Sequence, residues 1–126
     1  RGGYAYADYA DSASEKHVAA IESDRGAFTP EGFTVDSDSI TIARMNEWLP
    51  VLNKAEIHYV IKGGSGVDIS RMKNVKALIG YAPDNQRYFD FHHSANDVFE
   101  AVHPREMQLG TAAIAILAYL ISEEGI

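Results

Sequence analysis

The chain has 126 residues, 46% of them hydrophobic, which is enough for one compact domain with one apolar core. Its formal net charge of -7 excludes nucleic acid as the main partner, because binding to phosphates needs clustered lysine and arginine. The absence of cysteine excludes disulfides, thiolate zinc sites and cysteine nucleophiles.

The first half of the chain contains two predicted helices and one predicted strand. Residues 4–16 alternate alanine, tyrosine and acidic residues and predict a helix. Residues 18–21 form a short apolar run that is typical of a buried strand. Glycine and proline punctuate residues 25–36, which predicts a loop. A stripe of apolar residues then predicts a helix over residues 40–52, after several possible N-caps.

The second half continues the alternation of strands and helices. We expect strands at 57–61 and 75–81, a flexible loop at 62–66, a short helix or turn from Val67, an extended segment at 88–93 and a helix from Pro104 to about Ser122. The connections are long enough for parallel crossovers, so the pattern predicts an α/β fold with a mostly parallel sheet flanked by helices. The apolar run in the last helix is too short to span a bilayer and indicates a buried helix.

Polar groups follow three of the extended segments. They are Glu22-Ser23-Asp24, the stretch from Gly63 to Asp68, and His92-His93. Because ligands of open α/β sheets collect at the carboxyl ends of the strands, we expect these groups to lie at one edge of the sheet. Asp24 is either a metal ligand or a turn residue that bonds to nearby backbone N–H groups.

The segment from His92 to Asp97 carries the most specific signal in the chain. Neutral imidazole is the commonest metal ligand in proteins, and a bound histidine usually has a carboxylate or carbonyl on its other nitrogen. In one interpretation His93 binds a metal and Asp97 holds this region in place. In the other, both histidines are polar residues at the end of a strand and Asp97 caps the next helix.

The glycine-rich stretch does not fit two common motifs. It lacks the Gly-Lys-Ser/Thr ending of a phosphate loop, and Ile69 stands where a dinucleotide fingerprint has its third glycine. Val67 replaces the closing glycine of a serine hydrolase elbow around Ser65. The glycines instead indicate a backbone that passes close to a ligand or another segment. Asp68 is expected to orient a neighbour or to bond substrate.

Three blocks of sequence together resemble the co-catalytic zinc exopeptidases. They are residues 21–33, 63–69 and 88–97, and they cover nearly the whole chain in the order and rough spacing of that family. The most similar branch is the aminopeptidase Y and plasma glutamate carboxypeptidase family. The resemblance implies the layered zinc-exopeptidase fold, which is of the phosphorylase/hydrolase-like type, and a site that holds two zinc ions.

The resemblance assigns roles to six residues of this sequence. Asp24 and His93 match the later pair of family ligands, one for each zinc ion, and the aspartate four residues on selects His93 over His92. Val98 replaces the threonine that usually follows this aspartate in the family. For four further residues the resemblance implies contact with the substrate or with the metal ligands. These residues are Tyr88, His92, Asp68 and Asp97.

No residue of this chain matches the earlier family ligands. The family uses a further histidine, a bridging aspartate and a Glu-Glu pair that includes the general base, and in the family this pair lies shortly before a Gly-Gly and a Tyr-Ala helix. The chain opens at Arg1-Gly2-Gly3-Tyr4. We therefore expect residues 1–126 to be the C-terminal portion of a peptidase catalytic domain, truncated at its N-terminal side, with the general-base glutamate upstream of Arg1.

The expected function is hydrolysis of a terminal peptide bond by a metal-activated water in the intact enzyme, with a peptide or dipeptide as substrate. The chain alone is expected to bind zinc weakly and to be inactive. A bare sheet edge predicts a homo-oligomer or a strand-swapped assembly. Family analogy implies a secreted or periplasmic protein. The alternatives are a non-catalytic, peptidase-like binding module and a nucleotide-binding α/β domain.

Overall fold

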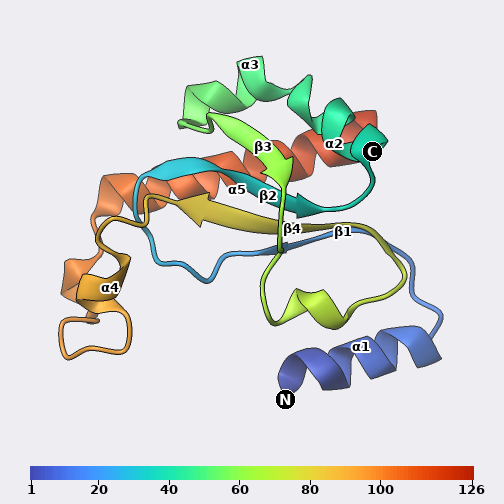
Figure 1. The fold of residues 1–126 in the computed structure, drawn as a ribbon, viewed down its shortest axis with the longest axis horizontal. Helices are drawn as coiled ribbons and strands as arrows, with labels where there is room; N and C mark the ends of the chain where they lie inside the picture. The colour runs from blue at the N-terminus through green and yellow to red at the C-terminus, as the bar shows by residue number, and fades with distance from the viewer.

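A four-stranded mixed sheet forms the centre of the computed structural model, which describes residues 1–126 (Figure 1). The strands are β1 (His17–Glu22), β2 (Pro30–Asp36), β3 (Tyr59–Lys62) and β4 (Val75–Pro83). Their order in the sheet is β1-β4-β2-β3. β1 pairs parallel with β4 and β2 parallel with β3, whereas β2 and β4 are antiparallel. The expected α/β class with a mostly parallel sheet is confirmed.

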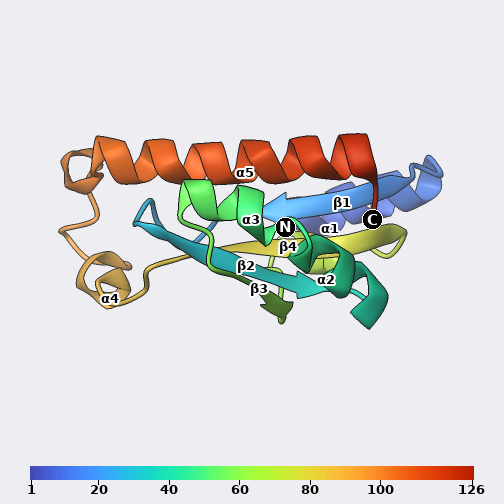
Figure 2. The same ribbon diagram turned by 90° about the horizontal axis from the view of Figure 1, so that it is seen from above.

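Helices surround this sheet. The α-helices are α1 (Gly2–Ser12), α2 (Ser39–Asn46), α3 (Leu49–Leu52), α4 (Tyr88–Phe91) and α5 (Pro104–Glu124), and the 3-10 turns are η1 (Asn53–Ala55), η2 (Ile69–Arg71) and η3 (Phe99–Ala101). α5 extends along one face of the sheet (Figure 2), while α1 packs against η2. No helix, α5 included, combines the length and the apolar character needed to cross a membrane.

The apolar core lies between α5 and the sheet. Ala113, Leu117 and Ile121 are spaced four residues apart on α5, so they share one face of the helix, and all three are buried. They belong to the same cluster as Phe33 and Val35 of β2, which alternate with residues on the opposite face of that strand. The opposite face of the sheet is therefore free of α5.

α2 begins at a strong N-cap that also contacts the sheet. The Asp38 carboxylate accepts a hydrogen bond from the Thr41 N–H at 2.7 Å. It also forms an ion pair with Lys76 of β4 at 3.0 Å. The bond from the Thr41 backbone, followed by that from Lys76, lowers the pKa of Asp38 to about 2. The cap therefore fixes the start of α2 to the central strand.

Two sequence-based assignments are wrong. Residues 30–36, expected within a loop, form β2, because Phe33 and Val35 are buried and the segment pairs with both β3 and β4. Pro30 and Gly32 are tolerated there since this end of the strand carries a bulge. Residues 88–93, expected to be extended, contain the short helix α4, which ends where His93 takes up a left-handed backbone conformation.

The carboxyl ends of the strands do not bring all three polar groups to one edge of the sheet, although the sequence led us to expect this. β3 runs antiparallel to β1, so its carboxyl end does not share an edge with the ends of β1 and β4. Instead residues 63–68, here called the crossing segment, pass over the face that α5 leaves free (Figure 1). They run from β3 at one edge to Glu22 of β1 at the other.

Close backbone contacts hold the crossing segment against the sheet. The Thr34 hydroxyl donates to the Gly64 carbonyl at 2.7 Å. A Cβ added at Gly80 of β4 would lie 2.8 Å from the Ser65 carbonyl oxygen and 3.2 Å from that of Gly64. The predicted close approach to another chain segment is thus confirmed, and Gly80 is the residue that makes room for it.

The fit at Gly80 can be tested by adding one methyl group. We expect Gly80→Ala to lower the free energy of unfolding by about 1–3 kcal/mol, because the new Cβ displaces a backbone carbonyl that cannot rotate away. Gly64→Ala is the matched control, since a Cβ there has no neighbour within 4 Å. Urea denaturation of both variants measures the difference, and equal stability of the two would contradict this account of Gly80.

Candidate metal site

The site is built at the end of β1, where the crossing segment meets Glu22. The Glu22 carboxylate accepts three backbone hydrogen bonds, from the N–H groups of Val67 at 3.1 Å, Asp68 at 3.0 Å and Ile69 at 3.1 Å. These donors are at the start of η2, where free N–H groups favour a negative charge. A Cβ at Gly66 would overlap this carboxylate, so the loop needs glycine at that position.

A pocket of about 170 Å³ opens beside this contact. Its lining includes Glu22, Asp24 and Arg25 from the end of β1, Ser65 from the crossing segment, and Tyr88 from α4. Arg25 is exposed and is the only basic residue in the lining. The pocket therefore brings together residues from the first two polar stretches of the sequence and adds Tyr88, which precedes the third.

An aromatic stack extends from this pocket to the double histidine. The ring of Tyr88 stacks on that of His92, with centroids 4.6 Å apart and an angle of 22° between the planes. Tyr88 and His92 are one helical turn apart, which places their side chains on the same face of α4. The His92 ring in turn lies 4.0 Å from the ring of His93. Tyr88 therefore connects the pocket that contains Asp24 to both histidines.

His93 has a backbone φ of 54°, in the left-handed region. A residue with a Cβ is strained there by about 1–2 kcal/mol, so the conformation is retained only where the surroundings enforce it. Such strain concentrates at functional sites. α4 ends at Phe91, His92 is its C-cap, and the chain changes direction at the left-handed residue His93.

Asp24 and His93 have the donor chemistry that a zinc ion requires. Both residues are exposed, and their side chains make no hydrogen bond or ion pair within the chain. A carboxylate oxygen and an imidazole nitrogen are both common zinc ligands, so this donor pair fits the metal. A zinc site usually has three or four protein ligands, and no group of three or more His, Cys, Asp or Glu side chains in this structure is arranged to hold a metal ion.

Of the six predicted site residues, Asp24 and Tyr88 line the pocket, whereas His92, His93, Asp68 and Asp97 do not. The Asp68 backbone N–H bonds to Glu22, and the residue borders a different cavity, beside Gly3 and Tyr6 of α1. Asp97 is exposed, and its backbone N–H bonds to the Ser94 carbonyl. The pocket lining contains neither residue.

Tyr81 of β4 was not singled out from the sequence. Its side chain is buried, and desolvation, with a further contribution from Glu106, raises the pKa of Tyr81 to about 12. Its hydroxyl donates to the Phe28 carbonyl at 3.5 Å. Tyr81 borders both the pocket at Asp24 and a larger one of about 380 Å³ against α5. The sequence signal was a lone tyrosine ending an apolar strand.

Known proteins with similar sequences are carboxypeptidases. No protein-family model matches the chain. Carboxypeptidase Q of Bos taurus is 28% identical over 111 residues, which cover 87% of this chain and 24% of that protein. Carboxypeptidase Q of Homo sapiens is 30% identical over 106 residues, or 82% of this chain and 22% of that protein. The chain thus spans about a quarter of the length of the curated relatives it matches.

The fold also has a solved counterpart. The crystal structure of a peptidase M28 precursor from Shewanella amazonensis superposes with a TM-score of 0.86 at 22% sequence identity. The match covers 99% of this chain and 29% of that protein. Every element described above therefore has a place in the fold of a known peptidase.

The role of Glu22 can be tested with a substitution that keeps the size of the side chain. Glu22→Gln replaces one acceptor oxygen with an NH₂ group that faces backbone donors, so we expect the free energy of unfolding to fall by about 1.5–3 kcal/mol. Amide hydrogen exchange at residues 67–69 should accelerate. Glu100→Gln is the control, because Glu100 is exposed and makes no side-chain contact of this kind. Unchanged exchange at 67–69 would refute the assignment.

Proposed function

We propose that this chain, a homologue of carboxypeptidase Q with the fold of an M28 peptidase, supplies two metal ligands to a di-zinc exopeptidase. Asp24 would bind one zinc ion through its carboxylate and His93 the other through its imidazole. The remaining ligands and the general-base glutamate would come from outside residues 1–126. In this proposal the chain is the C-terminal portion of the catalytic domain and is inactive alone.

The observation that carries the proposal is the pocket at the end of β1. It brings Asp24 next to Tyr88, whose ring stacks toward His92 and His93. The side chains of the two proposed ligands make no hydrogen bond or ion pair within the chain, and both residues occupy the family positions that the sequence resemblance indicates.

Each residue of the pocket has a chemical task in such an enzyme. When bound, a zinc pair polarises the scissile carbonyl and lowers the pKa of a bound water toward ~7. Asp24 and His93 would orient that pair through fixed donor atoms. Tyr88 and His92 would donate hydrogen bonds to substrate oxygens from the exposed end of the stack. Glu22 holds the pocket wall and has no free acceptor role in the reaction.

The substrate we propose is a peptide or dipeptide cleaved next to its carboxy-terminal residue, with amino-terminal cleavage as the alternative. The relatives' name is that of a carboxypeptidase. Arg25, the one basic residue in the pocket lining, would pair there with the free carboxylate of the substrate. The proposed compartment, secreted or periplasmic, rests on the resemblance to the exopeptidase family alone.

The competing function is a non-catalytic binding module. It is favoured by the lack of any three-ligand group among the described residues. It is disfavoured by the joint presence of Asp24 and His93 with free donor atoms. Metal-dependent hydrolysis separates the two functions, because a binding module would lack it.

The proposed ligands make a direct prediction for activity. In the protein that joins this chain to the other peptidase ligands, Asp24→Asn and His93→Ala should each lower kcat/KM for a dipeptide by at least about 100-fold, because each removes a ligand from the zinc pair. A chelator should abolish activity, and added zinc should restore it. His58→Gln is the control, since this exposed histidine lies near Asn53 and away from the pocket. Full activity of the Asp24 and His93 variants would contradict the proposal.

We further propose that β1 pairs with a strand of a second copy in the chain as it stands. β1 is an edge strand, and Val18 on it is 56% exposed. Cavities of about 550 and 520 Å³ lie along it, against α5 and against α1. An unpaired edge with apolar flanks is a template for another strand.

Light scattering after size-exclusion chromatography tests this pairing. We expect a dimer or larger species at micromolar concentration. A charge on the edge should disrupt it, so Val18→Lys should shift the mass toward the monomer, whereas Val98→Lys, at a similarly exposed valine away from β1, should not. A monomeric wild-type chain would overturn the pairing.

A further inference from the structure

The segment that carries His92 and His93 has little to hold it in place. None of residues 88–97 is buried. α4 is only four residues long, and no side chain caps it. Because an isolated short helix is unstable in water, the position of this segment depends on the few contacts that it makes with the rest of the chain.

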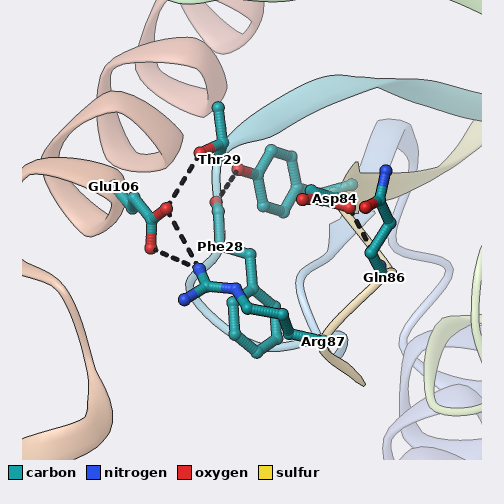
Figure 3. Close-up of polar contacts among 7 residues, drawn as sticks. Phe28, Thr29, Asp84, Gln86, Arg87 and Glu106 are labelled. Carbon is teal, nitrogen blue, oxygen red and sulfur yellow. Dashed lines mark hydrogen bonds and ion pairs between the residues drawn. The ribbon is translucent and has the colours of Figure 1, made fainter. Parts of the chain in front are cut away.

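The first of these contacts is an ion pair at the start of α4. The Arg87 Nη2 atom lies 3.1 Å from both carboxylate oxygens of Glu106, in the first turn of α5 (Figure 3). The Glu106 side chain is 21% exposed, so this pair is partly shielded from water. Glu106 also accepts a hydrogen bond from the Thr29 hydroxyl at 2.9 Å. One carboxylate thus joins α5, α4 and the segment that leads into β2.

The second contact is aromatic and centres on Phe28. The Arg87 guanidinium lies over the Phe28 ring, 5.0 Å from its centroid, and the Phe91 ring packs against Phe28 at 5.7 Å. Figure 3 shows Arg87 between the Phe28 ring and the Glu106 carboxylate. The Phe28 backbone is itself fixed, since its carbonyl accepts the Tyr81 hydroxyl. Arg87 therefore connects two contacts that would otherwise be separate.

These contacts join the segments that hold the two proposed zinc ligands. Phe28 follows Asp24 by four residues, and Phe91 precedes His93 by two. A motion of α4 away from Phe28 would carry His93 away from the segment that follows Asp24. The Arg87–Glu106 pair and the Phe28 ring, here called the Arg87 cluster, are the side-chain contacts that oppose this motion.

We propose that Arg87 and Glu106 are positioning residues that hold His93 at the distance from Asp24 that metal binding requires. The inference rests on the proposed function, because it assigns these residues a role toward the same pair of zinc ions. Neither residue touches the metal or the substrate in this scheme. Arg87 and Glu106 restrict the motion of α4, so that the donor atoms of Asp24 and His93 are in position before the zinc ions bind.

Replacement of Arg87 or Glu106 should lower the affinity for zinc, whereas the fold should remain intact. Residues that orient metal ligands typically contribute a factor of about 10–100 to metal affinity. The core between α5 and the sheet contains neither Arg87 nor Glu106, so it should survive their replacement. Arg87→Lys keeps the charge but loses the planar group over Phe28, and it should have an intermediate effect.

The test is a zinc titration of the 126-residue chain, followed by NMR of the histidine rings. In the wild-type chain, zinc chloride should shift the His93 ring signals. Arg87→Met and Glu106→Gln should each weaken the apparent affinity by at least about tenfold, with Arg87→Lys in between. Hydrogen exchange at residues 88–97, measured without metal, should accelerate in the same order.

Arg44→Met is the matched control. Arg44 also pairs with two glutamates, Glu47 at 2.6 Å and Glu124 at 2.9 Å, and it lies beside Trp48, so its loss tests for a general effect of removing an arginine. This variant should bind zinc like the wild type, whatever its thermal stability.

The outcomes separate the inference from the proposed function. If His93 of the wild-type chain does not respond to zinc, both the metal site and the positioning role are overturned. If it responds, and Arg87→Met responds with equal affinity, the metal site stands and the positioning role is wrong. Equal weakening by Arg87→Met and Arg44→Met would also overturn the positioning role, because the effect would then be one of overall stability.

Discussion

The contact between the Glu22 carboxylate and three successive backbone N–H groups determines the shape of the site. It attaches the end of the crossing segment to the edge strand β1, after that segment has passed over β2 and β4. Without it, the crossing segment would be held at its first residues, by the Thr34 hydroxyl bond to Gly64 and by the Gly63 N–H bond to the Val35 carbonyl. Ser65 and Gly66 form part of the pocket wall because the Glu22 carboxylate holds the end of the crossing segment in place.

The two halves of the candidate site are held by different physical means. Asp24 follows β1, whose position is set by the register with β4 and by the Glu22 contact. His93 follows a short exposed helix, whose position is set by an ion pair and by stacked rings. The first half is as rigid as the sheet. The half of the site that contains His93 is held by a few surface contacts, so α4 is the part of the site that can change position.

The sequence predicted the elements whose pattern was local. β1, β4 and α5 were found because their apolar residues follow one another or repeat with helical spacing. β2 was missed because Pro30 and Gly32 indicate a loop, whereas Phe33 and Val35 are stabilised by neighbours far away in the chain. α4 was missed for a similar reason: its four residues have no helical stripe of their own, and their partner Phe28 lies 60 residues earlier.

The polar residues of the site show the same division. Asp24 could be singled out by residue type and by its position after a strand, and the double histidine by residue type and by its spacing to Asp97. Glu22 was visible as a carboxylate, but its task was not, because its three donors lie at least 45 residues away. Arg87 and Glu106 are ordinary charged residues in sequence. Only the fold shows that they meet beside Phe28.

The strand order also bears on how the chain acquires its structure. β4 is the last strand in sequence, yet it lies between β1 and β2, which are made first. Among these four strands, β1 has no neighbour until β4 is made, and its pairing then joins residues nearly 60 positions apart. Contacts of such long sequence separation form slowly and leave apolar strands exposed during synthesis. Completion of the sheet must therefore await the emergence of its central strand from the ribosome.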